Sequence, residues 1–155
     1  MVLQMNSIEK GNFGELHVAA QLAKRGWIVA FPPYATRSID LLAFHPVHGT
    51  ISIQVKTKTV NNNDAKLFAH GSFCGDFLAL VWAPEDGSES VFFYAKDEIH
   101  SVVPSKQNTT NTLVRSLNHE KDGKLHVYVI RTRFPDEARR ENWELLHRTS
   151  EFGIR

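Results

Sequence analysis

The stretch 38–58, SIDLLAFHPVHGTISIQVKTK, decides the fold, because it predicts two β-strands joined by a tight turn. Residues that favour β-structure flank a central HPVHG, in which Pro46 and Gly49 supply the turn chemistry. Along 51–58 the side chains alternate, with isoleucine and valine on one face and serine, glutamine and lysine on the other. The pattern therefore predicts a β-hairpin with one apolar and one polar face.

The register of this hairpin brings polar residues together. Opposed residues in an antiparallel pair have a constant sum of positions, so pairing His45 with Gly49 around a three-residue loop places Asp40 opposite Gln54. Directly opposed Cβ atoms lie about 5 Å apart, and Lys56 follows Gln54 on the same face. We expect a carboxylate, an amide and an ammonium to converge there. A register one residue longer would separate them unless a bulge compensates.

Asp40 is an unusual residue for an apolar strand, because an ionised carboxylate is rarely buried without a partner or a metal. Two interpretations remain open at this point. Asp40 and Lys56 form a structural ion pair, or Asp40 belongs to a divalent-metal site.

The N-terminal segment predicts a helix that carries a second misplaced acid. Asn6 is a typical N-cap with Glu9 as its capping-box partner, and the helix is expected to run to about Arg25 and end at Gly26. Glu15 falls within its apolar stripe, at helical spacing from Val18, Ala19 and Leu22. Such a break in the pattern is typical of functional sites. Alternatively, Glu15 lies at the rim of the stripe and reaches water.

Composition indicates an ordinary globular protein. The 155 residues suit one domain, 1–155, with a core at about 6–95 and a C-terminal extension at about 96–155 that we expect to contribute partner contacts or oligomerisation. The formal net charge is only +1, with a mild basic excess in the last third. The single cysteine, Cys74, allows no internal disulfide and fits a cytoplasmic setting. No signal-peptide pattern and no membrane-spanning apolar run is present.

The rest of the chain adds alternating strand and helix signals. The expected elements are strands at 27–31, 76–83, 90–95 and 124–131, short helices at 65–68 and 112–118, and a last helix opened by Pro135. Together with the first helix and the hairpin, this order predicts an α/β domain with a mixed sheet. The segment 104–123 is polar and poorly patterned.

Three short strings carry a resemblance to a known family: KGNFGE at 10–15, SID at 38–40 and IQVK at 53–56. They resemble the PD-(D/E)XK nuclease superfamily, and are similar to archaeal Holliday-junction resolvases and, more closely, to the homing-endonuclease branch with a Q-x-K variant. The resemblance covers about residues 8–95. It implies a restriction-endonuclease-like αβββαβ core, with a mixed sheet flanked by helices.

The resemblance implies a Mg²⁺ site in which Mn²⁺ substitutes. Asp40 would be the main ligand, beside Gln54 Oε1 and the Val55 backbone carbonyl, while Glu15 holds a metal-bound water or a second ion. Lys56 would orient the attacking water and stabilise developing charge. Gln54 stands where most of the family has an acid. An amide carbonyl still ligates hard cations, but it brings no charge, so we expect weaker metal binding.

The function implied is a metal-dependent endodeoxyribonuclease that hydrolyses phosphodiester bonds in DNA. Lys10, Arg37, Lys58 and Lys66 would contact DNA phosphates. Making two cuts in a duplex favours a homodimer or a higher homo-oligomer. The alternative is a catalytically weak or inactive nuclease-fold module for DNA binding or assembly, which the neutral Gln54 and the low net charge favour.

Overall fold

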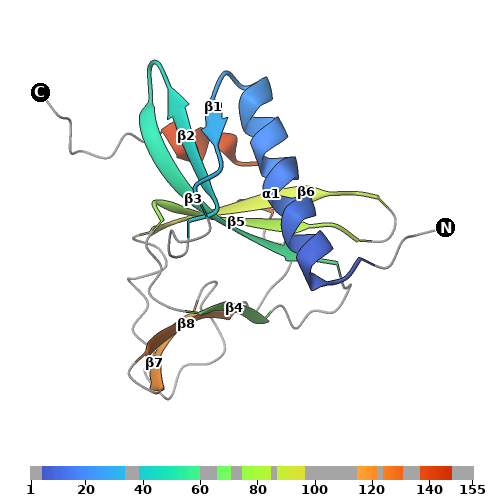
Figure 1. The fold of residues 1–155 in the computed structure, drawn as a ribbon, viewed down its shortest axis with the longest axis vertical. Helices are drawn as coiled ribbons and strands as arrows, with labels where there is room; N and C mark the ends of the chain where they lie inside the picture. Colours follow the sequence, from blue (N-terminus) through green and yellow to red (C-terminus); the bar gives the residue numbers. More distant parts are fainter. Residues whose placement is uncertain are drawn as a thin grey trace, which may run out of the picture.

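A five-stranded mixed sheet with one long helix on it forms the main body of the protein (Figure 1). The computed structural model describes residues 5–33, 39–59, 66–70, 75–84, 87–96, 115–121, 124–130 and 137–147. The helix is α1 (Ser7–Lys24), and the strand order is β1 (Ile28–Ala30), β2 (Leu41–His45), β3 (Gly49–Lys58), β5 (Phe77–Trp82) and β6 (Ser90–Ala95). Strands β3 and β5 are parallel and the other neighbours are antiparallel. The predicted α/β class with a mixed sheet is confirmed.

The predicted start and end of α1 are confirmed. The Asn6 carboxamide accepts hydrogen bonds from the amides of Ile8 (2.9 Å) and Glu9 (3.0 Å), and the Glu9 carboxylate accepts one from the Asn6 amide (2.7 Å). This capping box satisfies donors that the first helical turn leaves free. The helix ends before Gly26, whose φ of +86° suits glycine.

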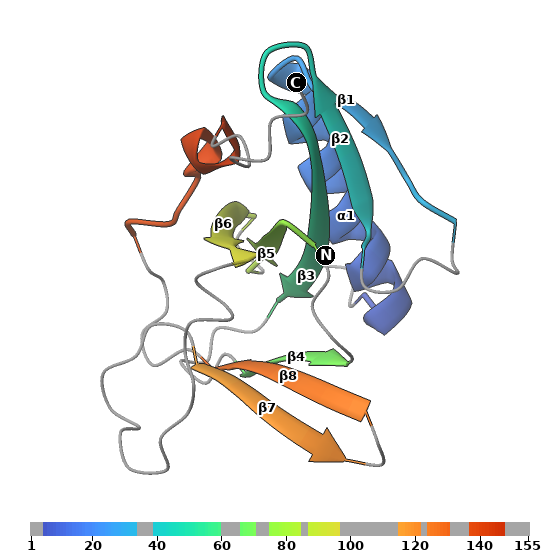
Figure 2. The ribbon, with the colours of Figure 1, turned by 90° about the vertical axis from the view of Figure 1, so that its left-hand side faces the viewer.

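The predicted hairpin register is also confirmed. His45 pairs with Gly49, and the ladder continues to Leu41 opposite Ile53. The sheet therefore has a helix face, which packs against α1, and an opposite face. The buried residues of the helix face and of α1 form one apolar cluster: Val18, Ala19, Leu22, Leu41, Ala43, Ile51, Ile53, Val55, Phe77, Ala79, Val81, Val91 and Phe93. Figure 2 looks onto β1, β2 and β3 with α1 behind them.

On the opposite face, Gln54, Leu78 and Tyr94 share one row across β3, β5 and β6. All three side chains are buried. Gln54 is therefore the polar member of an otherwise mostly apolar row in the middle of the sheet.

Close approach of α1 to β3 depends on Gly14. A Cβ atom at this position would overlap the Thr57 hydroxyl and would lie 3.2 Å from Thr57 Cβ and 3.4 Å from Val55 Cγ1. The absence of a side chain thus lets the helix lie against the strand, which places the next residue, Glu15, beside the sheet.

We expect Gly14→Ala to lower the free energy of unfolding by about 1–3 kcal/mol, because overpacking outweighs alanine's better helix propensity. Gly11→Ala is the matched control in the same helix: nothing lies within 4 Å of a Cβ there, so this variant should gain about 0.5–1 kcal/mol. Urea unfolding of both variants measures the difference. Equal stability of the two variants would contradict the close packing.

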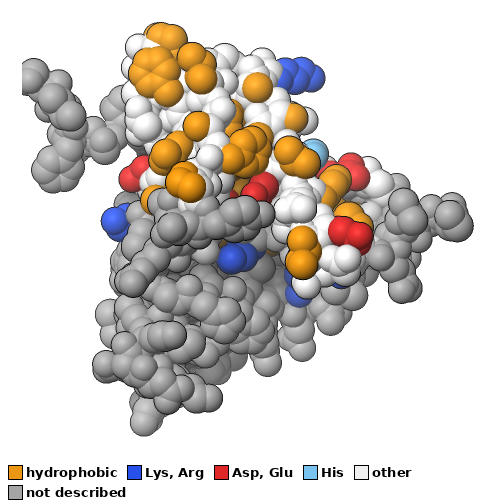
Figure 3. Space-filling view, viewed as in Figure 1, with side chains coloured by type: hydrophobic (Ala, Val, Ile, Leu, Met, Phe, Trp, Pro, Cys, Tyr) orange, Lys and Arg blue, Asp and Glu red, His pale blue; other side chains and the backbone are white. Residues whose placement is uncertain are grey.

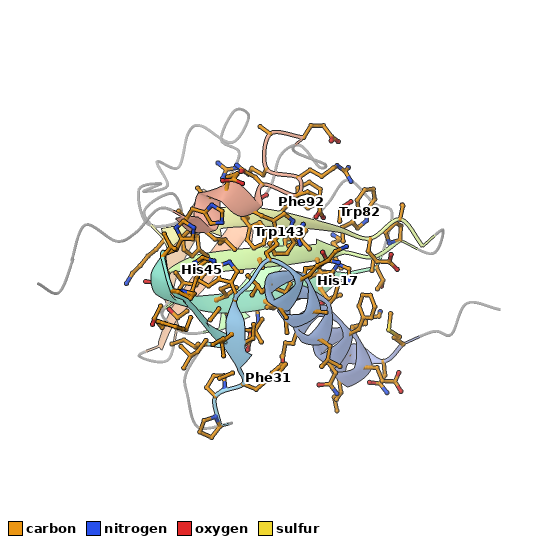
Figure 4. The ribbon with its side chains drawn as sticks, turned by 90° about the horizontal axis from the view of Figure 1, so that it is seen from above. His17, Phe31, His45, Trp82, Phe92 and Trp143 are labelled. Carbon is orange, nitrogen blue, oxygen red and sulfur yellow. The ribbon has the colours of Figure 1, made fainter. Side chains whose placement is uncertain are left out.

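The C-terminal part of the described chain returns to the sheet near the hairpin turn. The amide of Glu141 donates to Val91 O (2.7 Å) and the amide of Phe93 to Arg139 O (3.4 Å), so this segment lies along the edge of β6. The 3₁₀ helix η1 (Trp143–His147) then buries Trp143 against the sheet (Figure 4). Its His147 ring stacks on His48 at 4.0 Å.

This arrangement corrects the prediction of a longer last helix opened by Pro135. Pro135 itself lies outside the described residues, but 137–142 form turns and a bridge to β6 rather than helix. The hydrogen bonds to the edge of β6 compete with helical hydrogen bonds. For this reason residues 137–142 do not form a helix, although the sequence carries helix signals.

Two further helix predictions are wrong. Residues 66–70 form strand β4 (Lys66–His70), and 115–121 form strand β7 (Arg115–Lys121); both pair with β8 (Lys124–Ile130) in a three-stranded sheet of order β4-β8-β7. Pairing with a distant strand is a tertiary effect that overrides local propensity. The strands predicted at 27–31, 76–83, 90–95 and 124–131 are confirmed as β1, β5, β6 and β8, with Arg131 outside the described residues. No helix among the described residues is long and apolar enough to cross a bilayer.

Candidate active site

Asp40 lies one residue before β2 and spans Gln54 with two hydrogen bonds to β3. Its amide donates to Ile53 O (3.0 Å), and its carboxylate Oδ2 accepts from the Val55 amide (2.7 Å). The Asp40 side chain thus extends the hydrogen-bonded ladder between β2 and β3 by one bond beyond the pair Leu41–Ile53. Asp40 itself is half-buried.

This geometry counts against the ion-pair interpretation of Asp40, and the metal-site interpretation stays a prediction. The carboxylate bonds to the Val55 amide, whereas the ion pairs found among the described residues join Arg140 to Glu137 and His147 to Glu144. A structural Asp40–Lys56 ion pair is therefore not what holds the strands together. The side chain of Lys56 is half-buried on the same face of β3 as Gln54.

Gln54 provides a buried acceptor that nothing in the described structure satisfies. The residue is 3% exposed, and its Oε1 atom has no hydrogen-bond partner among the described residues. Leaving a buried acceptor unmet costs about 1–3 kcal/mol. Carboxylate and amide oxygens are suitable ligands for a hard cation, so Asp40 and Gln54 fit the Mg²⁺ that the sequence resemblance implies.

Glu15 is electrostatically coupled to the strand residues from its place on α1. Partial burial raises the pKa of its carboxyl, the negative charge of Asp40 raises it further, and the Lys56 ammonium opposes both effects. The fold therefore brings Asp40 and Lys56 within electrostatic reach of Glu15, although the three residues are far apart in sequence.

The raised pKa of Glu15 predicts a specific dependence of stability on pH. A carboxyl whose folded pKa exceeds its ordinary value of 4.5 contributes stability below that value and loses it as the pH rises through the raised pKa. At pH 7 the charged Glu15 is therefore unfavourable. We expect Glu15→Gln to raise the urea midpoint at pH 7 relative to the parent, with the gain shrinking towards pH 4. A lower midpoint at pH 7 alone would contradict this coupling.

The structure describes the side chains of two of the four predicted DNA-contact residues. Lys10 is half-buried on α1, and Lys58 ends β3 on the same face as Lys56. Lys66 begins β4, where only the backbone is described, and Arg37 lies outside the described residues. The face in Figure 3 carries acidic and basic side chains together near its middle rather than a field of one sign.

Among the described residues, no group of three histidine, cysteine, aspartate or glutamate side chains could hold a metal. A cation here would depend on Gln54 and on backbone oxygen in addition to Glu15 and Asp40. Two neighbours of the site, Gly14 and Thr57, have no candidate role in the sequence patterns. Only the close approach of α1 to β3 reveals that they set the position of Glu15.

The described residues form an α/β fold with a mixed five-stranded sheet. No family model matches the sequence, and no curated protein matches it either. Among solved structures, the fold is similar to that of the bacterial homing endonuclease I-Ssp6803I, with a TM-score of 0.54 and 16% sequence identity, covering 92% of this chain and 94% of that one. At this identity the likeness establishes the fold.

Proposed function

We propose that this protein is a Mg²⁺-dependent endodeoxyribonuclease of the PD-(D/E)XK type, with glutamine in place of the second acid. The observation that carries the proposal is the unmet, buried Oε1 of Gln54, a residue whose two chain neighbours, Ile53 and Val55, both bond to Asp40 through their backbone. The coupling of Glu15 to Asp40 and Lys56 supports it. So does the fold, since the solved structure it resembles is titled a homing endonuclease.

Each residue has a chemical role in this proposal. Asp40, Gln54 Oε1 and the Val55 carbonyl hold the cation, which when bound supplies polarisation of the phosphate and a more acidic water. Glu15 would hold a metal-bound water or ligate a second ion, and its pKa responds to the charges of both Asp40 and Lys56. Lys56 orients that water and stabilises the negative charge that develops on the phosphate.

DNA is the proposed partner, with Lys10, Arg37, Lys58 and Lys66 as phosphate contacts. A homodimer or higher homo-oligomer would allow both strands of a duplex to be cut. Mn²⁺ should replace Mg²⁺, because both accept oxygen ligands.

The test is cleavage by the full chain of supercoiled plasmid and of branched DNA, in Mg²⁺, in Mn²⁺ and in EDTA. We expect nicking or linearisation with either cation and none in EDTA. Cleavage that persists in EDTA, or the absence of cleavage of every DNA form in both cations, would overturn the proposal.

A second candidate function is an inactive module that binds DNA. The neutral Gln54, which weakens cation binding, and the low formal net charge of +1 favour it. Calorimetry with Mn²⁺ separates the two candidates. DNA binding without any Mn²⁺ binding would support the inactive module.

A further inference from the structure

A second aspartate, Asp76, binds β3 from the other side and has no part in the chemistry above. It lies just before β5, and its Oδ2 accepts hydrogen bonds from the Ser52 amide and from the Ser52 hydroxyl, both at 2.8 Å. In return, the Asp76 amide donates to Ser52 O (2.9 Å) and lies within hydrogen-bonding distance of Ser52 Oγ (3.0 Å).

Asp76 and Asp40 bind β3 in equivalent ways. Each lies one residue before its own strand, and each carboxylate accepts a backbone amide of β3: Asp76 from Ser52 and Asp40 from Val55. Gln54 lies between these two attachment points. Its neighbour on the β5 side is Leu78, two residues after Asp76.

The residue before Asp76 also touches the strand. A Cβ atom at the buried Gly75 would lie 3.4 Å from Ser52 O and 3.5 Å from Gln54 N. The start of β5 is therefore packed against the backbone of Gln54. A shift of β5 along β3 would displace this backbone and, with it, the side-chain carbonyl oxygen of Gln54.

We propose that Asp76 is a positioning residue of the candidate site. Through Ser52 it fixes the position of Gln54, and with it the side-chain carbonyl oxygen Oε1, relative to Asp40. The inference rests on the proposed function. Groups that support a ligand without touching the cation typically change metal affinity or activity by about 10–100-fold. Because Gln54 is a neutral ligand, it contributes less to cation affinity than a carboxylate does. The position of its oxygen therefore matters more for binding.

The experiment measures Mn²⁺ affinity by calorimetry and cleavage by the full chain, for Asp76→Ala, Asp76→Asn and Ser52→Ala. We expect Asp76→Ala to weaken Mn²⁺ binding and to lower kcat by about 10-fold or more each, with KM for DNA within about twofold. Asp76→Asn keeps an oxygen that accepts both Ser52 hydrogen bonds, so it should restore both values to within about threefold. Glu144→Ala is the control, since this carboxylate also holds one partner, His147 (2.9 Å), near the turn of the hairpin; it should match the parent.

Four results would overturn the inference. The first is an Asp76→Ala variant with parental Mn²⁺ affinity and kcat. The second is an Asp76→Asn variant as defective as Asp76→Ala, which would mean that charge and not hydrogen bonding matters, and the third is an equal loss in Glu144→Ala. The fourth applies where Asp76→Ala does not fold, and it is parental Mn²⁺ affinity in Ser52→Ala. A parent chain that neither binds Mn²⁺ nor cuts DNA overturns the proposed function, and this inference with it. An active parent with an equally active Asp76→Ala overturns this inference alone.

Discussion

Lys56→Ala is expected to slow metal-dependent DNA cleavage by nearly three orders of magnitude. A charge about 4 Å from the developing phosphate charge, at an effective dielectric near 20, is worth about 4 kcal/mol, and each 1.4 kcal/mol is about a tenfold change in rate. Because Lys56 opposes the raised pKa of Glu15, its removal should raise that pKa further. Single-turnover cleavage of plasmid DNA at saturating Mg²⁺ measures the loss.

Two other lysines serve as comparisons. Lys24→Ala, in the exposed last turn of α1, should cut at the parental rate. Lys58→Ala should raise KM while leaving kcat near the parental value, because a phosphate contact acts on binding. A Lys56→Ala variant that cuts as fast as the parent would show that the site is misassigned.

The sequence predicts the site's framework because its local signals agree with one another. Strict alternation along 51–58 and the turn chemistry of 46–49 leave few registers, so the pairing of His45 with Gly49 follows from the pattern. Glu15 stands out because it breaks a helical apolar stripe. Both signals depend on side-chain periodicity, which needs no knowledge of the rest of the chain.

The features that the sequence misses depend on contacts between distant segments. Strands β4 and β7 are short and ambiguous alone, and they acquire their identity from β8. Asp76 looks like an ordinary residue at the start of a strand, and its role follows only from the parallel register of β5 on β3. The hydrogen bond of the Asp40 carboxylate to the Val55 amide, rather than to Lys56, likewise depends on the three-dimensional arrangement of β2 and β3.

The electrostatics of the site offer a reason for glutamine at 54. Burial and the charge of Asp40 already raise the pKa of Glu15. A third carboxylate at a position only 3% exposed would add like charge with little solvent to screen it, and one of the three acids would then bind a proton. In the proposed site, the neutral amide would supply an oxygen ligand without adding a third carboxylate.

Replacing Asp40 with alanine should abolish Mn²⁺ binding and reduce cleavage by at least about 100-fold, and it should also destabilise the fold. The Val55 amide loses its acceptor, which costs about 1–3 kcal/mol where the group stays buried. Calorimetry with Mn²⁺, plasmid cleavage and urea unfolding together record the three effects.

Asp40→Asn separates the ligand role from the structural one. Its side-chain oxygen still accepts from the Val55 amide, and loss of the charge relieves Glu15. We therefore expect parental stability or a small gain at pH 7, with cleavage still reduced by at least about 100-fold, because the neutral ligand no longer balances the charge of the cation. If Asp40→Asn instead loses stability and keeps its Mn²⁺ affinity, Asp40 is a structural cap of β3 and the cation binds elsewhere.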